Sequence, residues 1–236
     1  MACIVCGSNE TVRSHIIPRA LFRLGARTGH QIIGSRRNQP GYQYLQSGFW
    51  DDNILCSAHE MRLGKYDDYA ARFCRRFFQA TSDGAFAVTV SNPRPHDLVS
   101  FAAACVWRMA AARSDSQPIN LLGPYAEHLR QMLFGDATFD PLLLVSRSAF
   151  VHGKDTLNLS MLPHRYQELG INFWRFVACG IIFDLKLDAR PAPPAMAMLA
   201  VNDARDVLLH EDFPQQVLGT PMIAASLRMM GGAGKR

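Results

Sequence analysis

The sequence predicts an α+β protein in which a small zinc-stapled module precedes a larger domain of mixed helices and strands. Two pairs of candidate zinc ligands bracket the first sixty residues. Helical and strand-like periodicities then follow one another without regular alternation. The hydrophobic content of 48% is typical of a globular chain with a packed core. We expect a zinc module over residues 1–80 and an α+β domain of unknown role over residues 81–236.

The candidate zinc ligands are Cys3, Cys6, Cys56 and His59. A structural zinc ion takes four nitrogen or sulfur ligands, usually as two pairs. The two members of a pair are separated by a short turn, so that both side chains can reach the same ion. The pairs Cys3–Cys6 and Cys56–His59 have this spacing, so we expect one bound Zn²⁺. The other cysteines stand singly in apolar surroundings and are expected to be buried thiols: Cys74, Cys105 and Cys179.

The first eighty residues predict a short series of elements. Residues 1–10 have the pattern of a zinc knuckle, in which Gly7 supplies a tight turn. A strand over 12–17, a helix over 19–24 that follows Pro18, and a helix over 60–79 with apolar residues at helical spacing come next. Residues 25–52 are rich in Gly, Gln, Asn and Ser and predict a long loop that can hold a hairpin, and such loops are usually functional.

The remaining chain predicts both helices and strands. The expected strands cover 85–91, 142–151, 156–162, 181–187 and 196–201, and the expected helices cover 97–113 and 124–134. The strands 142–151 and 156–162 are expected to pair around a turn. In 181–187, apolar residues alternate with Asp184 and Lys186, which is typical of a half-buried strand.

The positive charge is concentrated in the predicted zinc module. Residues 1–80 hold 11 Lys and Arg against 6 Asp and Glu, whereas residues 81–236 hold 14 of each, so the net charge of +5 belongs to the first segment. Such an excess can attract a phosphate backbone. The longest nearly apolar stretch, 98–107, is too short to span a bilayer, and the start of the chain has no signal-peptide pattern. We therefore expect a cytoplasmic protein in a reducing compartment.

The N-terminal motifs together resemble the HNH endonuclease family. They are Cys3-Ile-Val-Cys6, Ser14-His15-Ile16-Ile17-Pro18 and Asn53-Ile54-Leu55-Cys56-Ser57-Ala58-His59-Glu60, in the order in which that family has its zinc pairs, its His-Ile-x-Pro and its Asn before Leu-Cys. The resemblance covers residues 3 to about 66. It implies a ββα-metal fold on a zinc-binding treble clef, in a bacterial branch with an extra C-terminal domain.

The resemblance also implies site residues. His15 falls on the general base, a role that imidazole suits because its pKa lies near neutrality. Asn53 falls on a residue that binds the catalytic metal, Mg²⁺ or Mn²⁺, or fixes the loop that holds the base. Glu60 stands where the third, name-giving histidine usually lies, and Ser14 stands where many members have a metal-binding Asp. In an alternative register, His59 is the third catalytic histidine and the zinc site lacks one ligand.

The predicted function is metal-dependent hydrolysis of phosphodiester bonds in nucleic acid, with DNA favoured over RNA. Arginine suits phosphate through its forked donors, and aromatic side chains of the long loop can stack on bases or pack the loop down. One rival is a catalytically inactive nucleic-acid-binding module. Another is an interaction protein in which zinc is purely structural and residues 81–236 bind a protein partner or a second copy of the chain. The candidate nucleic-acid-binding residues are Arg13, Arg19, Arg23, Arg27 and Lys65, and the loop aromatics are Tyr42, Tyr44, Phe49 and Trp50.

Overall fold

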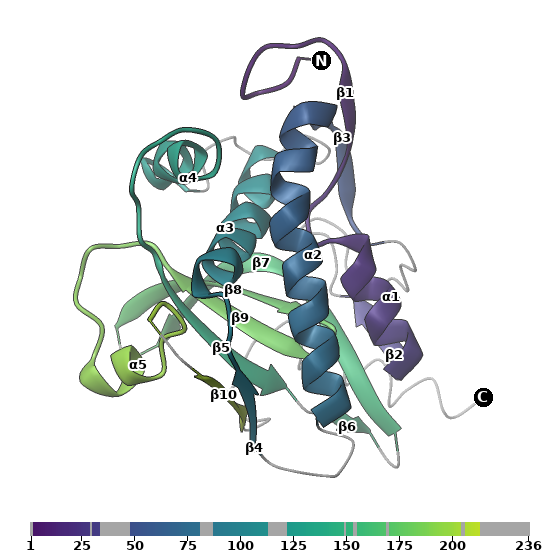
Figure 1. Ribbon diagram of the computed structural model, residues 1–236, viewed down its shortest axis with the longest axis vertical. Coiled ribbons are helices and arrows are strands. Elements are labelled where there is room, and N and C mark those ends of the chain that lie inside the picture. Colours follow the sequence, from purple (N-terminus) through teal and green to yellow (C-terminus); the bar gives the residue numbers. More distant parts are fainter. Residues whose placement is uncertain are drawn as a thin grey trace.

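A mixed β-sheet with two long helices packed over it forms the centre of the protein (Figure 1). The helices are α2, Ser57–Ala80, and α3, Pro95–Ala111. This is a computed structural model, and it describes residues 2–28, 30–33, 48–80, 87–112, 122–148, 150–152, 155–168, 170–203 and 206–212. The mixture of helices with a largely antiparallel sheet confirms the α+β class.

In the described chain the sheet has eight strands, and most neighbours are antiparallel. Their order is β2-β7-β8-β9-β5-β10-β4, with β6 also paired to β7. The parallel pairs are β2 with β7 and β10 with β5. The strands are β2 His30–Ile33, β4 Ala87–Ser91, β5 Leu142–Ser148, β6 Phe150–His152, β7 Asp155–Glu168, β8 Ile171–Ala178, β9 Ile181–Lys186 and β10 Asp206–Asp212.

A separate two-stranded sheet leads into α2. Its strands, β1 Thr11–His15 and β3 Trp50–Cys56, are antiparallel, and the register shifts between Val12 and Ser14. Helix α1, Arg19–Thr28, follows β1 directly after Pro18. The chain passes from the end of β3 into α2 at consecutive residues, which fixes the start of the helix beside the strand pair.

The core lies between α3 and the sheet. Helix α3 is buried along most of its length, and Phe101 packs edge-on against Phe176 and Phe183, at ring-centroid distances of 5.8 and 5.3 Å. The two sheet phenylalanines stack on each other at 4.9 Å. Burying a large apolar side chain contributes about 1.5–3 kcal/mol, so this cluster anchors the helix to the sheet.

The described apolar core is continuous from the N-terminal segment into the rest of the chain. One cluster of buried residues extends from Cys3 to Val201. Strand β2, within the first eighty residues, pairs with β7. Residues 1–80 therefore pack extensively against the rest of the described chain, and a domain boundary near residue 80 stays a prediction.

Strand β9 is buried on both faces, so the prediction of a half-buried strand is wrong. Every residue from Ile181 to Lys186 is buried. Asp184 forms a two-bond ion pair with its cross-strand neighbour Arg175, with both N–O distances 2.7 Å. The Arg175 guanidinium also lies 3.7 Å from the ring centre of Tyr166. Lys186 pairs with Asp188 at 2.8 Å, so the two polar residues that alternate along β9 are buried in ion pairs and are not exposed to solvent.

Several elements differ from the sequence-based expectation. Residues 196–201 were expected to form a strand, but the chain forms helix α5, Pro194–Met198, because a proline fits the first turn of a helix and Ala and Met favour helices. Strand β5 pairs with β9, while the short β6 makes the expected hairpin with β7. Strand β8 was not predicted; it joins β9 through Cys179 and Gly180, which both have positive φ.

The remaining helix, α4 Tyr125–Phe134, lies beside the N-terminal end of the molecule, close to where α2 begins (Figure 1). No helix in the described ranges is long and apolar enough to cross a membrane.

Candidate metal centre and the adjoining charge network

Cys3, Cys6, Cys56 and His59 meet at one point at the start of α2. Their ligand atoms all lie within 4.8 Å of one another. The Sγ atoms of Cys6 and Cys56 are 3.9 Å apart, and His59 Nδ1 lies 3.7 Å from Cys3 Sγ and 3.1 Å from Cys56 Sγ. Two sulfurs bound to one tetrahedral zinc at about 2.3 Å are separated by about 3.8 Å. The cluster therefore has the dimensions of a Cys₃His metal site, as the spacing predicts.

Backbone hydrogen bonds hold the first ligand pair in place. The N–H of Cys3 donates to the carbonyl of Ser8 at 2.7 Å, and the N–H of Gly7 donates to the carbonyl of Cys3 at 2.8 Å. Gly7 has a φ of +77°, a region that glycine adopts without strain. The N–H of Ile4 donates to the carbonyl of Ile54 in β3. This last bond places the Cys3 pair beside the Cys56 pair.

The environment of Cys3 favours its thiolate, which is the form that binds zinc. Burial by itself raises the pKa of Cys3, but hydrogen bonds from the backbones of Cys56, Cys6 and Val5 outweigh it and lower the pKa to about 7. Thiolates stabilised by backbone N–H groups are ready to coordinate a metal without a large cost of deprotonation.

Helix α4 packs against the metal cluster from the C-terminal half of the chain. The ring of Phe134 meets that of His59 edge-on at 5.3 Å and that of Trp107 at 5.1 Å. Arg62, one turn after His59, donates to the carbonyls of Phe134 and Gly135 at 3.0 and 3.4 Å. These contacts orient the imidazole, as outer partners of metal ligands commonly do.

A buried charge network begins at the residue after His59. Arg108 of α3, with a side chain fully shielded from solvent, donates to Glu60 at 3.2 Å and makes a two-bond ion pair with Asp67 at 2.9 and 3.2 Å. Ser14 Oγ of β1 donates to the other oxygen of Glu60 at 3.0 Å. The network thus connects β1, α2 and α3, starting at the residue that follows the last member of the metal cluster.

The protonation of the network follows from burial opposed by the ion pairs. Burial raises the pKa of Glu60 and of Asp67 above their ordinary values, and the charge of Arg108 opposes this in both. Burial would lower the pKa of Arg108, but the two carboxylates raise it, so the guanidinium stays charged. Each oxygen of Glu60 accepts one bond from a protein group, which leaves a second lone pair on each oxygen, although the charge of Arg108 already partly neutralises the carboxylate.

His15 is the last residue of β1 and lies opposite Trp50, the first residue of β3. It is half-buried, and its ring centre is 6.0 Å from that of Trp50, with which it is paired across the strands. Asn53, in β3, donates its side-chain amide to Asp51 Oδ1 at 3.1 Å, and the same oxygen accepts the backbone N–H of Asn53. These two bonds to Asp51 orient the Asn53 side chain within β3 and leave its amide oxygen as the acceptor atom.

The candidate nucleic-acid-binding residues fall on three elements, β1, α1 and α2. Arg13 is exposed, lies 4.8 Å from the Trp50 ring and 3.4 Å from Asp52. Arg19 and Arg23 are exposed on α1, and Lys65 is exposed on α2. Phe49 is buried and therefore packs the loop down instead of stacking on bases. The side chains of Arg27, Tyr42 and Tyr44 lie outside the described residues.

The sequence did not identify Arg108 or Asp67 as site residues. Arg108 follows ten nearly apolar residues on a helix that the sequence did predict. A charged side chain on such a helix must be paired, because an unpaired buried charge is very costly. The sequence therefore indicated that Arg108 needs an ion-pair partner. It did not identify Glu60 and Asp67 as the partners, because the packing of α2 against α3 cannot be read from local sequence.

In the described part of the chain, the Cys₃His cluster is the one group of three or more Cys, His, Asp or Glu side chains that converge closely enough to hold a metal ion. No family model, curated protein or solved structure matches this chain. The site is therefore interpreted from its own geometry.

We expect one tightly bound Zn²⁺ per chain. Cys6→Ser should abolish it and unfold the N-terminal segment, because the binding free energy of structural zinc contributes directly to folding. The affinity should fall as the pH is lowered, since every ligand must lose its proton to bind. Elemental analysis and a chelator competition at pH 8 and pH 5.5 measure both effects. Cys105→Ala, which alters a buried cysteine outside the cluster, is the control. A folded Cys6→Ser protein that keeps its zinc would contradict this assignment.

We expect Arg108→Met to lower the free energy of unfolding by about 3–5 kcal/mol, because it leaves two partly buried carboxylates without their cation. Adding Glu60→Gln and Asp67→Asn to that variant should restore part of the loss, since the uncompensated charges are then gone. Denaturant titrations measure both changes. An Arg130→Gln control, which breaks an exposed pair on α4, should change little. Equal losses in the single and triple variants would show that the charge network is not the cause.

Proposed function

We propose that the chain is a metal-dependent endonuclease of the HNH type, with DNA as the more favoured substrate. The observation that carries this proposal is the arrangement of β1, β3 and α2. Strand β1 ends at His15, β3 pairs with it, and α2 begins immediately after β3, so that Cys56 ends the strand and His59 lies in the first turn of the helix. This is the order of elements that the resemblance implies for a ββα-metal module.

His15 is the proposed general base. An imidazole accepts a proton from water near neutral pH, which makes the oxygen nucleophilic toward a phosphodiester. The half-buried position beside Trp50 keeps the ring accessible at the edge of the strand pair. A bound Mg²⁺ or Mn²⁺ would polarise the scissile phosphate and stabilise the leaving oxygen.

Asn53 and Glu60 are the residues that would hold this second ion. Both offer an oxygen, which is the ligand that hard cations prefer. Asn53 uses its amide nitrogen on Asp51, so its oxygen is the atom for a cation. Magnesium keeps several water ligands and is often held by one or two protein groups together with substrate phosphates. Water and the phosphates of the nucleic acid would therefore supply most of the ligands of the Mg²⁺ or Mn²⁺ ion.

A specific observation supports a second candidate, an inactive nucleic-acid-binding module. Ser14 and Glu60 occupy the positions where the family pattern has metal-binding Asp and His, and they hydrogen-bond to each other while Arg108 provides the neighbouring positive charge. A buried guanidinium can neutralise the carboxylate in place of a divalent cation. In this candidate the zinc cluster and the basic surface are retained without hydrolysis, and the protein works in the cytoplasm by binding alone.

We expect His15→Ala to lower the rate of plasmid nicking by about 10²–10⁴-fold, the usual contribution of a positioned general base. Zinc content and nucleic-acid affinity should stay nearly unchanged. Nicking of supercoiled plasmid is measured with Mg²⁺, with Mn²⁺ and with a chelator that leaves zinc bound. His96→Ala, which removes an exposed histidine of α3, is the matched control. Nicking by the His15→Ala chain at the native rate would show that His15 is not the general base. If the native chain binds nucleic acid but does not nick it with any metal, the inactive binding module is supported.

We expect the exposed arginines of α1 to carry a measurable share of nucleic-acid affinity. Each phosphate neutralised on duplex DNA adds about 0.9 to the slope of log affinity against log salt, so Arg19→Gln with Arg23→Gln should flatten that slope. The control pair is Arg94→Gln with Arg130→Gln, which removes the same charge from residues 81–236. The intact chain is used for every variant, because β2 belongs to the larger sheet. Equal slopes for the two pairs would contradict a localised basic surface.

A further inference from the structure

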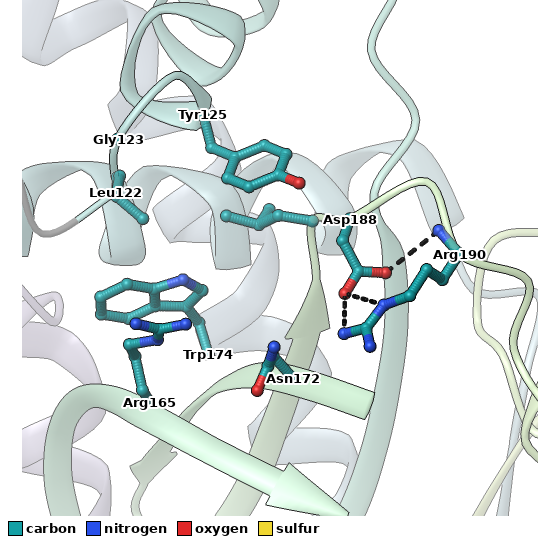
Figure 2. Close-up of a pocket in the computed structure, with 9 residues that line it drawn as sticks. Leu122, Gly123, Tyr125, Arg165, Asn172, Trp174, Asp188 and Arg190 are labelled. Carbon is teal, nitrogen blue, oxygen red and sulfur yellow. Dashed lines mark hydrogen bonds and ion pairs between the residues drawn. The ribbon is translucent and has the colours of Figure 1, made fainter. Parts of the chain in front are cut away.

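A second candidate site is formed by residues of the C-terminal half of the chain, whereas the metal cluster lies in the N-terminal half. It is a pocket of about 500 Å³, between the start of α4, the hairpin of β7 with β8, and the residues after β9. Ligand sites commonly have volumes of roughly 300–1,000 Å³. Figure 2 shows the residues that line it. The lining residues that carry the argument are Leu122, Tyr125, Arg165, Asn172, Trp174 and Arg190.

Arg165 supplies a cation without a partner at this pocket. In the described part of the chain, Arg165 makes no hydrogen bond or ion pair, whereas Arg175 and Arg190 are both bound to carboxylates. Arg165 is the direct cross-strand neighbour of Trp174, and Figure 2 shows its guanidinium beside the indole ring. A guanidinium placed against an aromatic face is held in orientation while its N–H groups remain able to bind an anion.

The charges around the pocket are predominantly positive. Asp188 is the one carboxylate among the lining residues, and it is engaged by two cations: Arg190 at 2.6 Å and Lys186 at 2.8 Å. Its partial burial would raise its pKa, but these hydrogen bonds lower it below the ordinary value, so Asp188 stays ionised. The charged residues that line the pocket are therefore two arginines and one aspartate, and Arg190 pairs with Asp188, which leaves the charge of Arg165 for a ligand.

The opposite wall of the pocket is apolar and aromatic. Leu122 is buried just before α4, and Tyr125 begins that helix with its ring facing the sheet residues across the pocket (Figure 2). Asn172 extends from the start of β8 toward the same space. Its side-chain oxygen accepts a bond from Gln167 at 3.3 Å, which leaves its amide N–H groups available as donors.

We propose that this pocket binds a small organic anion, with a phosphate or carboxylate group held by Arg165 and Asn172 and a flat apolar body packed against Tyr125 and Leu122. Arginine and amide donors match the oxygens of either anion. The apolar wall excludes bare inorganic anions as good ligands, because they would leave it without contact. This site is independent of the metal cluster and of the proposed hydrolysis.

The test is calorimetric titration of the intact, zinc-loaded chain at low salt with four probes. They are 5′-AMP, which pairs a phosphate with a flat ring, benzoate, which pairs a carboxylate with one, inorganic phosphate and uncharged adenosine. We expect 5′-AMP or benzoate to bind one per chain and at least tenfold more tightly than inorganic phosphate or adenosine. The probe that binds distinguishes a phosphate ligand from a carboxylate ligand.

Variants locate the binding. Arg165→Gln should weaken the preferred probe at least tenfold, while Arg72→Gln, which removes an exposed arginine of α2, should bind as the native chain does. Because Arg165 is exposed, its replacement should leave the melting temperature unchanged. The proposal is overturned by no binding of either organic anion, by equal affinity for inorganic phosphate, or by an Arg165→Gln chain that binds as well as the native one.

Discussion

The convergence of Cys3, Cys6, Cys56 and His59 is the constraint on which the N-terminal structure depends. The segment before α1 buries Cys3, Ile16 and Ile17 in the core, and the cluster with a few backbone hydrogen bonds holds the turn formed by residues 3–8. The same cluster sets where α2 starts, because two of its members lie at the junction of β3 and α2. A metal that fixes four side chains at this junction also fixes the strand pair that carries His15.

The charge network extends this constraint into the rest of the protein. Glu60 follows His59 directly, and Arg108 connects it to α3, which packs on the sheet through Phe101. Ser14 joins the network one residue before His15. The proposed base, the metal cluster and the central helix are therefore connected by consecutive, well-packed contacts. A change at Arg108 should be felt at His15 through Glu60 and Ser14, without direct contact between them.

The sequence predicted those features that depend on local pattern. The metal ligands were found from their spacing, and α2, α3 and α4 were found from helical periodicity, with boundaries that differ by three residues or fewer. The α+β class followed from the same patterns. The burial of Cys74, Cys105 and Cys179 is also confirmed.

The features that failed depend on contacts between distant residues. Strand β8 was missed although it is strongly apolar, because its pairing with β7 and β9 is not written in local sequence. The same limit explains Asp184, whose burial is decided by Arg175 on the neighbouring strand, and Glu60, whose partner Arg108 is 48 residues away. At 194–198, the prolines that seemed to interrupt a strand instead begin a helix.

The central claim is that three cysteines and one histidine of this chain bind a single zinc ion. X-ray absorption at the zinc edge of the purified protein tests it most directly, because sulfur and nitrogen neighbours differ in distance, at about 2.3 and 2.0–2.1 Å. The expected first shell contains three sulfurs and one nitrogen. A His59→Cys variant should convert that shell to four sulfurs. A shell dominated by oxygen or nitrogen, or a native shell of two sulfurs, would contradict the assignment.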